Sequence, residues 1–213
     1  MKPKAATNQP ISHPRRRPMP QQRRGQPDQP ARLYPVSLRE FQQLLAAVGN
    51  DAVANNLRQI AAIVFYTGIR PGELKSLTWS NVDMEKCSMR VGSKSGKQRT
   101  VPFGHEVLQI LVDRAKANAG AQYVLGKSPS AILHRISRRV QALPRTTDGR
   151  KLTLYSLRHS FALRWVNAGG SLVALMVMMG FSGHHPLKTF LSQVQAFVGA
   201  ARFQSQLEDQ EAI

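Results

Sequence analysis

Apolar residues at helical spacing begin abruptly after Ser37, and this pattern marks the start of the folded part of the chain. Ser37 and Glu40 form the sequence pattern of a capping box, which begins a helix. The apolar residues that follow lie three and four positions apart, as on one helix face: Leu38, Phe41, Leu44, Leu45 and Val48. We expect this helix to end at Gly49. A second helix over residues 57–66 is apolar nearly all round, which predicts that it lies in the core, and Gly68 ends it.

Between residues 87 and 103 the period changes from helical to alternating. Met89 and Val91 alternate with polar residues, residues 93–97 form a turn, and residues 100–102 form the returning strand. This pattern predicts a β-hairpin with a cationic tip. Further helical patterns cover residues 105–118, 129–143, 157–168 and 171–179, and a last helix is expected to start near Pro186. The predicted fold class is therefore mainly α with a small antiparallel β-sheet.

The first 34 residues have a different composition and are predicted to form a disordered basic arm ahead of one folded domain over residues 35–213. Residues 1–32 contain seven of the 13 prolines and eight Lys or Arg against one acid, Asp28. So little apolar surface cannot offset the entropy of ordering the chain. Two interpretations stay open. Arg15, Arg16 and Arg17 follow a DNA backbone, or the arm is only a solvated linker or solubility tail.

The charge of the whole chain indicates a polyanionic partner. Thirty Lys and Arg against 12 Asp and Glu give a formal charge of +18, which disfavours the compact state by self-repulsion. A nucleic acid is the first candidate, ahead of a membrane surface or an anionic protein. The longest apolar stretch, residues 172–179, is too short to span a bilayer, and the single Cys87 excludes an internal disulfide. We expect a cytoplasmic protein without a membrane partner, a cofactor or a metal site.

Two arginines occur where a phosphate group would be bound. Arg70 lies in a tight turn between two helices, with Glu73 placed to orient its guanidinium, and a planar fork of donors suits two phosphodiester oxygens. Arg158 is predicted in the first turn of a helix, where the dipole also favours an anion. The alternative is an ordinary surface arginine paired to Glu73. Lys94, at the hairpin tip, is placed to reach into a groove or donate a proton.

In this order and spacing the segments resemble the catalytic domain of the tyrosine recombinases, the phage integrase family. Thr67-Gly68-Ile69-Arg70-Pro71-Gly72-Glu73-Leu74 is similar to the first arginine box of that family, and Tyr155-Ser156-Leu157-Arg158-His159 to the second. The resemblance implies that Arg70 and Arg158 bind the phosphate and that Lys94 is the general acid. Tyr155 stands where the family commonly has histidine, and it can still donate a hydrogen bond.

Two departures from the family pattern concern catalysis. Phe181 occupies the position of a family histidine, and Phe190, nine residues on, occupies that of the nucleophilic tyrosine. A shifted alignment on His184 places Gln193 at the nucleophile instead, and no tyrosine follows Tyr155. A phenyl ring has no oxygen to attack phosphorus, so the covalent route is lost.

The sequence therefore favours a DNA-binding protein on a recombinase scaffold, with an accessory or regulatory role in recombination, for example of a mobile element. Two alternatives stay open. The first is an active recombinase whose nucleophile comes from a partner, and the second is a non-specific basic nucleic-acid-binding protein. Expected partners are double-stranded DNA and, on it, further copies of this chain or an active recombinase. Further candidates for DNA contact, with an ordinary solvated basic face as the alternative for the helical ones, are Lys97, Arg99, Arg135, Arg138 and Arg139.

Overall fold

The computed structural model describes residues 35–92, 98–144 and 151–181, together with residues 190, 192 and 194. The helices within these residues are α1 (Leu38–Ala46), α2 (Ala52–Thr67), α3 (Pro71–Ser76), α4 (His105–Ala117), α5 (Pro129–Gln141), α6 (Leu154–Asn167) and α7 (Leu172–Met179). The strands are β1 (Val82–Asp83), β2 (Ser88–Gly92) and β3 (Gln98–Pro102), and a short 3₁₀ turn, η1 (Trp79–Asn81), precedes β1. The predicted fold class, mainly α with a small antiparallel sheet, is confirmed.

Helix α1 begins as the sequence predicts but ends earlier. The hydroxyl of Ser37 accepts from the Glu40 amide at 3.2 Å, and the Glu40 carboxylate accepts from the Ser37 amide at 2.8 Å. The helix ends at Ala46 rather than at Gly49. The Arg58 side chain, from α2, donates to the carbonyls of Leu45 and Gly49, and this contact satisfies acceptors that a longer helix would use internally.

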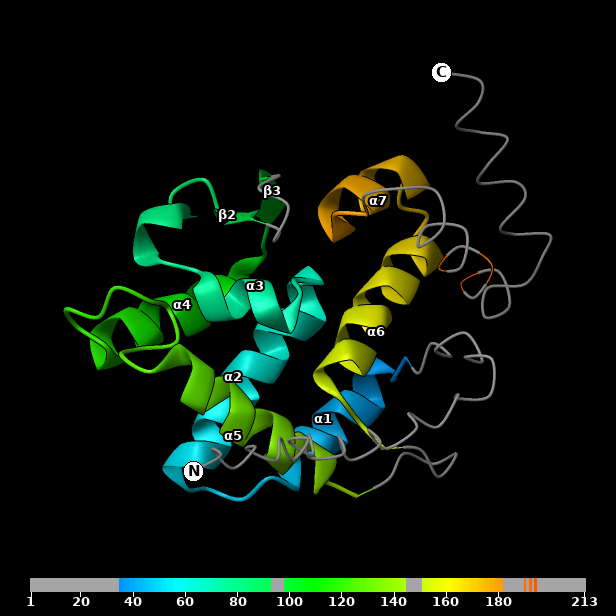
Figure 1. Cartoon of the computed structure of the whole chain (residues 1–213). Coiled ribbons are helices and arrows are strands. Elements are labelled where there is room, and N and C mark those ends of the chain that lie inside the picture. Colours follow the sequence, from blue (N-terminus) through cyan, green and yellow to red (C-terminus); the bar gives the residue numbers. More distant parts are fainter. Residues whose placement is uncertain are drawn as a thin grey trace, which may run out of the picture. The chain divides into compact units, whose positions relative to one another are not determined.

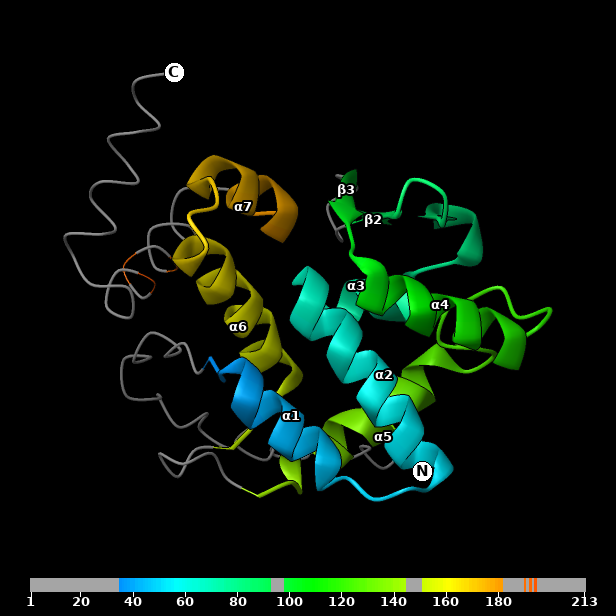
Figure 2. The same cartoon turned by 180° about the vertical axis from the view of Figure 1, so that it is seen from behind.

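Helix α2 is the central element, and it packs against α4, α5 and α6 (Figure 1). It is longer than predicted because Asp51 caps it, its carboxylate accepting from the Ala54 amide at 2.7 Å. The apolar run of its second half is buried as expected, with Ile60, Ile63 and Phe65 all inaccessible to solvent. Figure 2 shows α1 near the first half of α6, where the amide of Val36, just before α1, donates to the Ser160 hydroxyl at 2.7 Å.

The three strands form one antiparallel sheet in the order β1-β2-β3. The predicted hairpin is confirmed in its two strands, where Met89 pairs with Val101 and both side chains are buried. Strand β1 was not predicted, because two residues are too few to show an alternating pattern. The sheet contacts α3, which follows Arg70, through β2, and it contacts α7 through β3. Helix α7 in turn packs against α6, which carries the second arginine box.

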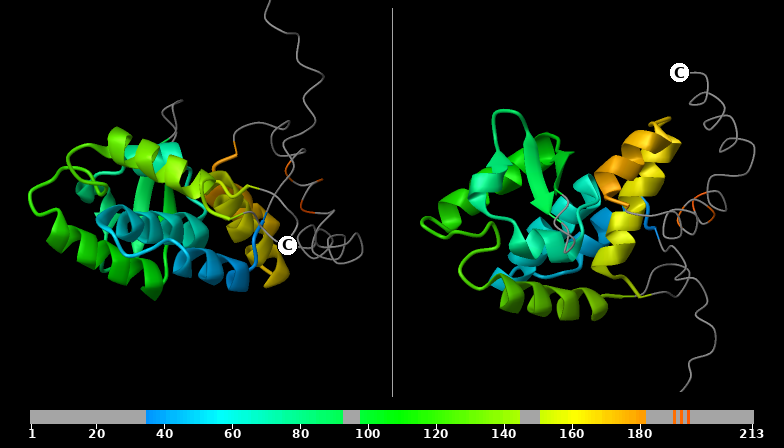
Figure 3. Two further views of the ribbon diagram at one scale, coloured as in Figure 1. Left: turned by 90° about the horizontal axis from the view of Figure 1, so that it is seen from below. Right: turned by 45° about the horizontal axis from the view of Figure 1, so that its top comes forward.

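Helices α6 and α7 lie side by side in both views of Figure 3. A separate apolar cluster holds them together and includes two residues beyond α7: Ala162, Val166, Leu172, Leu175, Met179, Phe190 and Val194. Helix α6 starts at Leu154, earlier than predicted, because Thr153 and Ser156 form a capping box. Arg158 therefore lies in the second turn of α6, and the prediction that placed it in the first turn is wrong.

Among the helices that the structure describes, none is long and apolar enough to cross a membrane. The predicted arm over residues 1–34 lies outside the described residues, as does the start of the last predicted helix at Pro186. Phe190, Ser192 and Val194 are helical.

Candidate phosphate-binding site

Arg70 is fixed at the start of α3 by the carboxylate of Glu73. Oxygen Oε2 of Glu73 accepts from the Arg70 backbone amide at 2.9 Å, and Oε1 accepts from Arg70 Nη1 at 2.9 Å. The predicted pairing of Glu73 with the Arg70 guanidinium is therefore confirmed. The second terminal nitrogen of Arg70 donates to the carbonyl of Gly180 at 2.6 Å, and 30% of the side chain is exposed.

Arg158 is held much deeper. Its residue is only 4% exposed, and its two terminal nitrogens donate to the carbonyls of Gly68 and Met179, the latter at 2.5 Å. Burial, with a smaller contribution from repulsion by Arg70, lowers the pKa of Arg158 to about 9. The group is thus charged at neutral pH, and in the dry interior its field is weakly screened.

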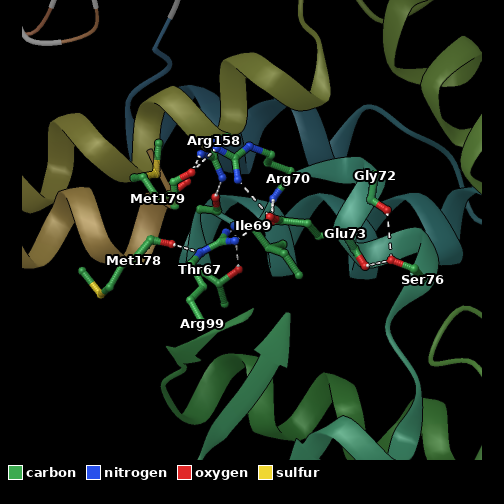
Figure 4. Close-up of polar contacts among 12 residues, drawn as sticks. Thr67, Ile69, Arg70, Gly72, Glu73, Ser76, Arg99, Arg158, Met178 and Met179 are labelled. Carbon is green, nitrogen blue, oxygen red and sulfur yellow. Dashed lines mark hydrogen bonds and ion pairs between the residues drawn. The ribbon is translucent and has the colours of Figure 1, made fainter. Parts of the chain in front are cut away.

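Arg99 is a third member of this cluster that the sequence did not place there. It was expected to contact DNA from the hairpin, but its side chain is only 9% exposed. Its Nη1 and Nη2 donate to the two oxygens of Glu73 at 2.5 and 2.8 Å, and its Nε donates to the carbonyl of Met178 at 2.6 Å. Figure 4 shows the three guanidiniums converging from α3, β3 and α6.

The C-terminal end of α7 is the common acceptor of these arginines. The carbonyls of Met178, Met179 and Gly180 each receive one guanidinium, from Arg99, Arg158 and Arg70 in that order. The last carbonyls of a helix lack internal partners and carry partial negative charge, so they favour cations. Gly180 is required here, because its φ is +62° and a Cβ would lie 2.8 Å from Arg99 Nη1.

The cluster carries more positive than negative charge. Three guanidiniums surround the single carboxylate of Glu73. Burial acts to raise the pKa of Glu73, but the hydrogen bonds from Arg99 and Arg70 outweigh it and lower the pKa, so the carboxylate is ionised. Two positive charges remain in excess, and this excess favours the binding of an anion such as a phosphodiester.

The two positions that depart from the family pattern are in contact with each other. The rings of Phe181 and Phe190 lie 4.8 Å apart, centroid to centroid, at an angle of 40°. Phe190 is 6% exposed and belongs to the apolar cluster of α6 and α7, and Phe181 packs against that cluster. Tyr155, by contrast, is 55% exposed on the first turn of α6.

The basic face predicted on α5 is only partly free of intramolecular contacts. Arg135 and Arg138 are exposed. Arg139 instead donates to the carbonyl of Val48 at 3.2 Å and lies 3.4 Å from the carboxylate of Asp51. It therefore ties α5 to the turn between α1 and α2. Lys94, Lys97, Arg15, Arg16 and Arg17 lie outside the described residues.

Comparison with known sequences identifies the family. The sequence profile of the phage integrase family matches residues 36–190. The chain belongs to the phage integrase family of tyrosine recombinases. Tyrosine recombinase XerD of Vibrio cholerae is 30% identical over 172 residues, which cover 73% of this chain and 56% of XerD. XerC of Natranaerobius thermophilus is 28% identical over 182 residues, 78% of this chain and 59% of XerC. This phage integrase family chain spans about half the length of the curated relatives it matches.

Solved structures show the same fold. The XerA recombinase superposes with a TM-score of 0.61 at 21% identity, covering 83% of this chain and 64% of XerA. The catalytic domain of bacteriophage HP1 integrase gives a TM-score of 0.54 at 23% identity, covering 76% of this chain and 88% of that domain. The described part of this family member is thus folded as a tyrosine recombinase catalytic domain.

Proposed function

We propose that this protein binds double-stranded DNA through Arg70 and Arg158 and does not cut it. The observation that carries the proposal is the convergence of both guanidiniums on one short turn, residues 179–180, with two positive charges in excess around it. A phosphodiester offers two charged oxygens, which are strong acceptors for guanidinium donors. The Tn1549 transposon integrase and the XerH recombinase, which share this fold, are solved in complexes with DNA.

The absence of cutting follows from Phe190. Its ring is buried against Phe181 and provides no hydroxyl, so no phosphotyrosine bond can form at this position. Arg70, Arg158 and Lys94 would still bind and polarise a phosphate. The protein would then occupy a recombination site, in the cytoplasm, as an accessory or regulator of an active recombinase, such as that of a mobile element.

Salt-dependent binding tests the first half of the proposal. Fluorescence anisotropy with a mixed-sequence duplex of about three helical turns measures the slope of log affinity against log salt. Six or more phosphate contacts give a fall of roughly 10³ between 50 and 200 mM salt. Arg70→Ala should weaken binding more than Arg15→Ala and Arg16→Ala combined. Equal effects would indicate a simple polycation, and no effect of Arg70→Ala would contradict the proposed site.

A pool of nicked duplexes with random sequence beside the nick tests the second half. The nick lets the severed fragment diffuse away, so any covalent protein–DNA complex accumulates and is visible on a denaturing gel. The wild-type protein should give no such complex. Its appearance would overturn the non-cutting assignment, and mapping the linked residue would identify the nucleophile.

A further inference from the structure

We propose that Arg99 is a positioning residue for phosphate binding, which acts by occupying both oxygens of Glu73 and so keeps Arg70 available for DNA. This inference rests on the proposed function above. In this role Arg99 acts through Glu73 and does not itself contact DNA.

The location of Arg99 excludes it from a groove-contacting role. In β3 it pairs with Val91 of β2, and its side chain points inward, on the same side as Val101. Only 9% of that side chain is exposed, against 30% for Arg70. Among the described residues, the Arg99 side chain donates twice to Glu73 in α3 and once to Met178 in α7, both of which are other elements.

The carboxylate of Glu73 is fully used. An ionised carboxylate offers about four lone-pair sites. In Glu73 these sites accept from the Arg70 amide, from Arg70 Nη1, and from Nη1 and Nη2 of Arg99. The two-bond pairing, which is the strongest arrangement for an arginine and a carboxylate, thus belongs to Arg99.

Arg70 would take that pairing if Arg99 were absent. It lies three residues from Glu73, and one of its terminal nitrogens already contacts Oε1. Without the bond from Arg99 Nη2, Oε2 would keep only the Arg70 amide, and a second bond from the Arg70 side chain would close a fork-to-fork pair and turn the guanidinium toward α3. The presence of Arg99 limits Arg70 to one side-chain bond with Glu73 and one with Gly180, so its remaining donors have no partner among the residues that the structure describes and can bind a phosphate.

Charge acts in the same direction. Without Arg99, the Glu73 carboxylate would be neutralised by Arg70 itself, and the positive excess of the cluster would fall from two charges to one. Removing Arg99 should therefore weaken phosphate binding although Arg99 itself does not touch DNA.

Salt slopes distinguish positioning from direct contact. The variants are Arg70→Ala, Arg99→Gln, Arg99→Lys and the double variant Arg70→Ala with Arg99→Gln, measured with the mixed-sequence duplex. Arg90→Gln is the matched control, because Arg90 is an exposed arginine of the same hairpin outside the cluster. The loss of one phosphate contact lowers the magnitude of the slope by about 0.9. The affinity then falls about 3-fold less between 50 and 200 mM salt than it does for the wild type. Arg70→Ala and Arg99→Gln should each lower the slope by this amount, and the double variant by no more.

The conservative variant separates geometry from charge. Arg99→Lys keeps the positive charge but cannot form the fork, so it should also lower the slope, whereas a bulk-charge role predicts the wild-type value. This variant serves as well if Arg99→Gln does not fold, which thermal unfolding reports. A slope that falls twice as far in the double variant, or an unchanged slope in Arg99→Lys, overturns the inference. If Arg70→Ala alone is without effect, the proposed function itself fails.

Discussion

Arg70 and Arg158 donate to the carbonyl oxygens of neighbouring residues, Gly180 at 2.6 Å and Met179 at 2.5 Å. Two side chains far apart in the sequence thus bind the carbonyls of two adjacent residues. The acceptors are the last carbonyls of α7, whose partial negative charge occupies the place an anion would take. A phosphate must therefore use the guanidinium donors that these two carbonyls leave unoccupied, or displace the carbonyls of residues 179–180.

The first prediction concerns the stability of the arginine cluster. Glu73→Gln should lower the free energy of unfolding by about 3 kcal/mol, because Glu73 is the acid that pairs with the buried arginines in the part of the chain that the structure describes. Urea denaturation, monitored by circular dichroism, measures the free energy of unfolding. Glu85→Gln, on an exposed residue, is the control and should change it by less than about 0.5 kcal/mol. A similar small change for both variants would show that Glu73 does not stabilise the cluster.

Gly68 provides a second prediction, on the carbonyl that holds Arg158. Its φ is +64°, and a Cβ there would lie 2.4 Å from Cδ1 of Phe161. Gly68→Ala should therefore cost about 2–4 kcal/mol, from backbone strain and overpacking together. Gly72→Ala is the matched control in the next turn, where no atom lies within 4 Å. Because Gly72 is inside α3, alanine there should be neutral or stabilising by up to about 1 kcal/mol. Equal melting temperatures for Gly68→Ala and Gly72→Ala would contradict the close approach of Gly68 to Phe161.

The elements could be predicted from the sequence because each depends on local chemistry. The capping box at Ser37 and the alternation through Met89 and Val91 act over a few residues, so helix α1 and the hairpin follow directly. The starts of α2 and α6 were missed although their caps are local, whereas the end of α1 was missed where a distant side chain intervenes. Arg58, in α2, donates to the carbonyls of Leu45 and Gly49 at the end of α1. The residues between Leu45 and Gly49 contain no sequence pattern that predicts this contact.

The site was predicted in part for the same reason. Arg70 and Glu73 are three residues apart, so their ion pair is a local feature of the turn. The role of Arg99 depends on three elements meeting, and its acceptor at Met178 is a backbone carbonyl, which every residue possesses. The signal that could have indicated burial is the strand alternation, which places Arg99 on the same face as Val101.

The third prediction concerns pH. Burial, followed by repulsion from Arg158, lowers the pKa of His159 from 6.5 to about 4. Between these values the unfolded chain binds more protons than the folded one, so lowering the pH through this window destabilises the fold. The loss is at most about 1.4 kcal/mol per pH unit. His159→Gln, which cannot titrate, should show a shallower dependence in urea denaturation.

The carboxylates titrate in both proteins, so the difference between the wild type and His159→Gln isolates the imidazole. Its contribution should be fully present above about pH 6.5 and lost toward pH 4. A difference that stays constant over this range would show that His159 is not desolvated.

The last prediction asks whether the missing hydroxyl is what prevents cutting. Phe190 is helical, its ring contacts that of Phe181, and it is the last residue of the family match. Phe190→Tyr adds one oxygen and little volume, so the packing of α6 and α7 should survive. If Arg70, Arg158 and Lys94 still polarise a phosphate, this single change should yield a covalent complex with the nicked DNA pool.

Phe181→His is the control, because it restores the other family position without supplying a nucleophile, and it should yield none. A folded Phe190→Tyr protein that binds DNA but forms no complex would mean that more than the nucleophile has been lost. In that case the arginine cluster serves binding alone.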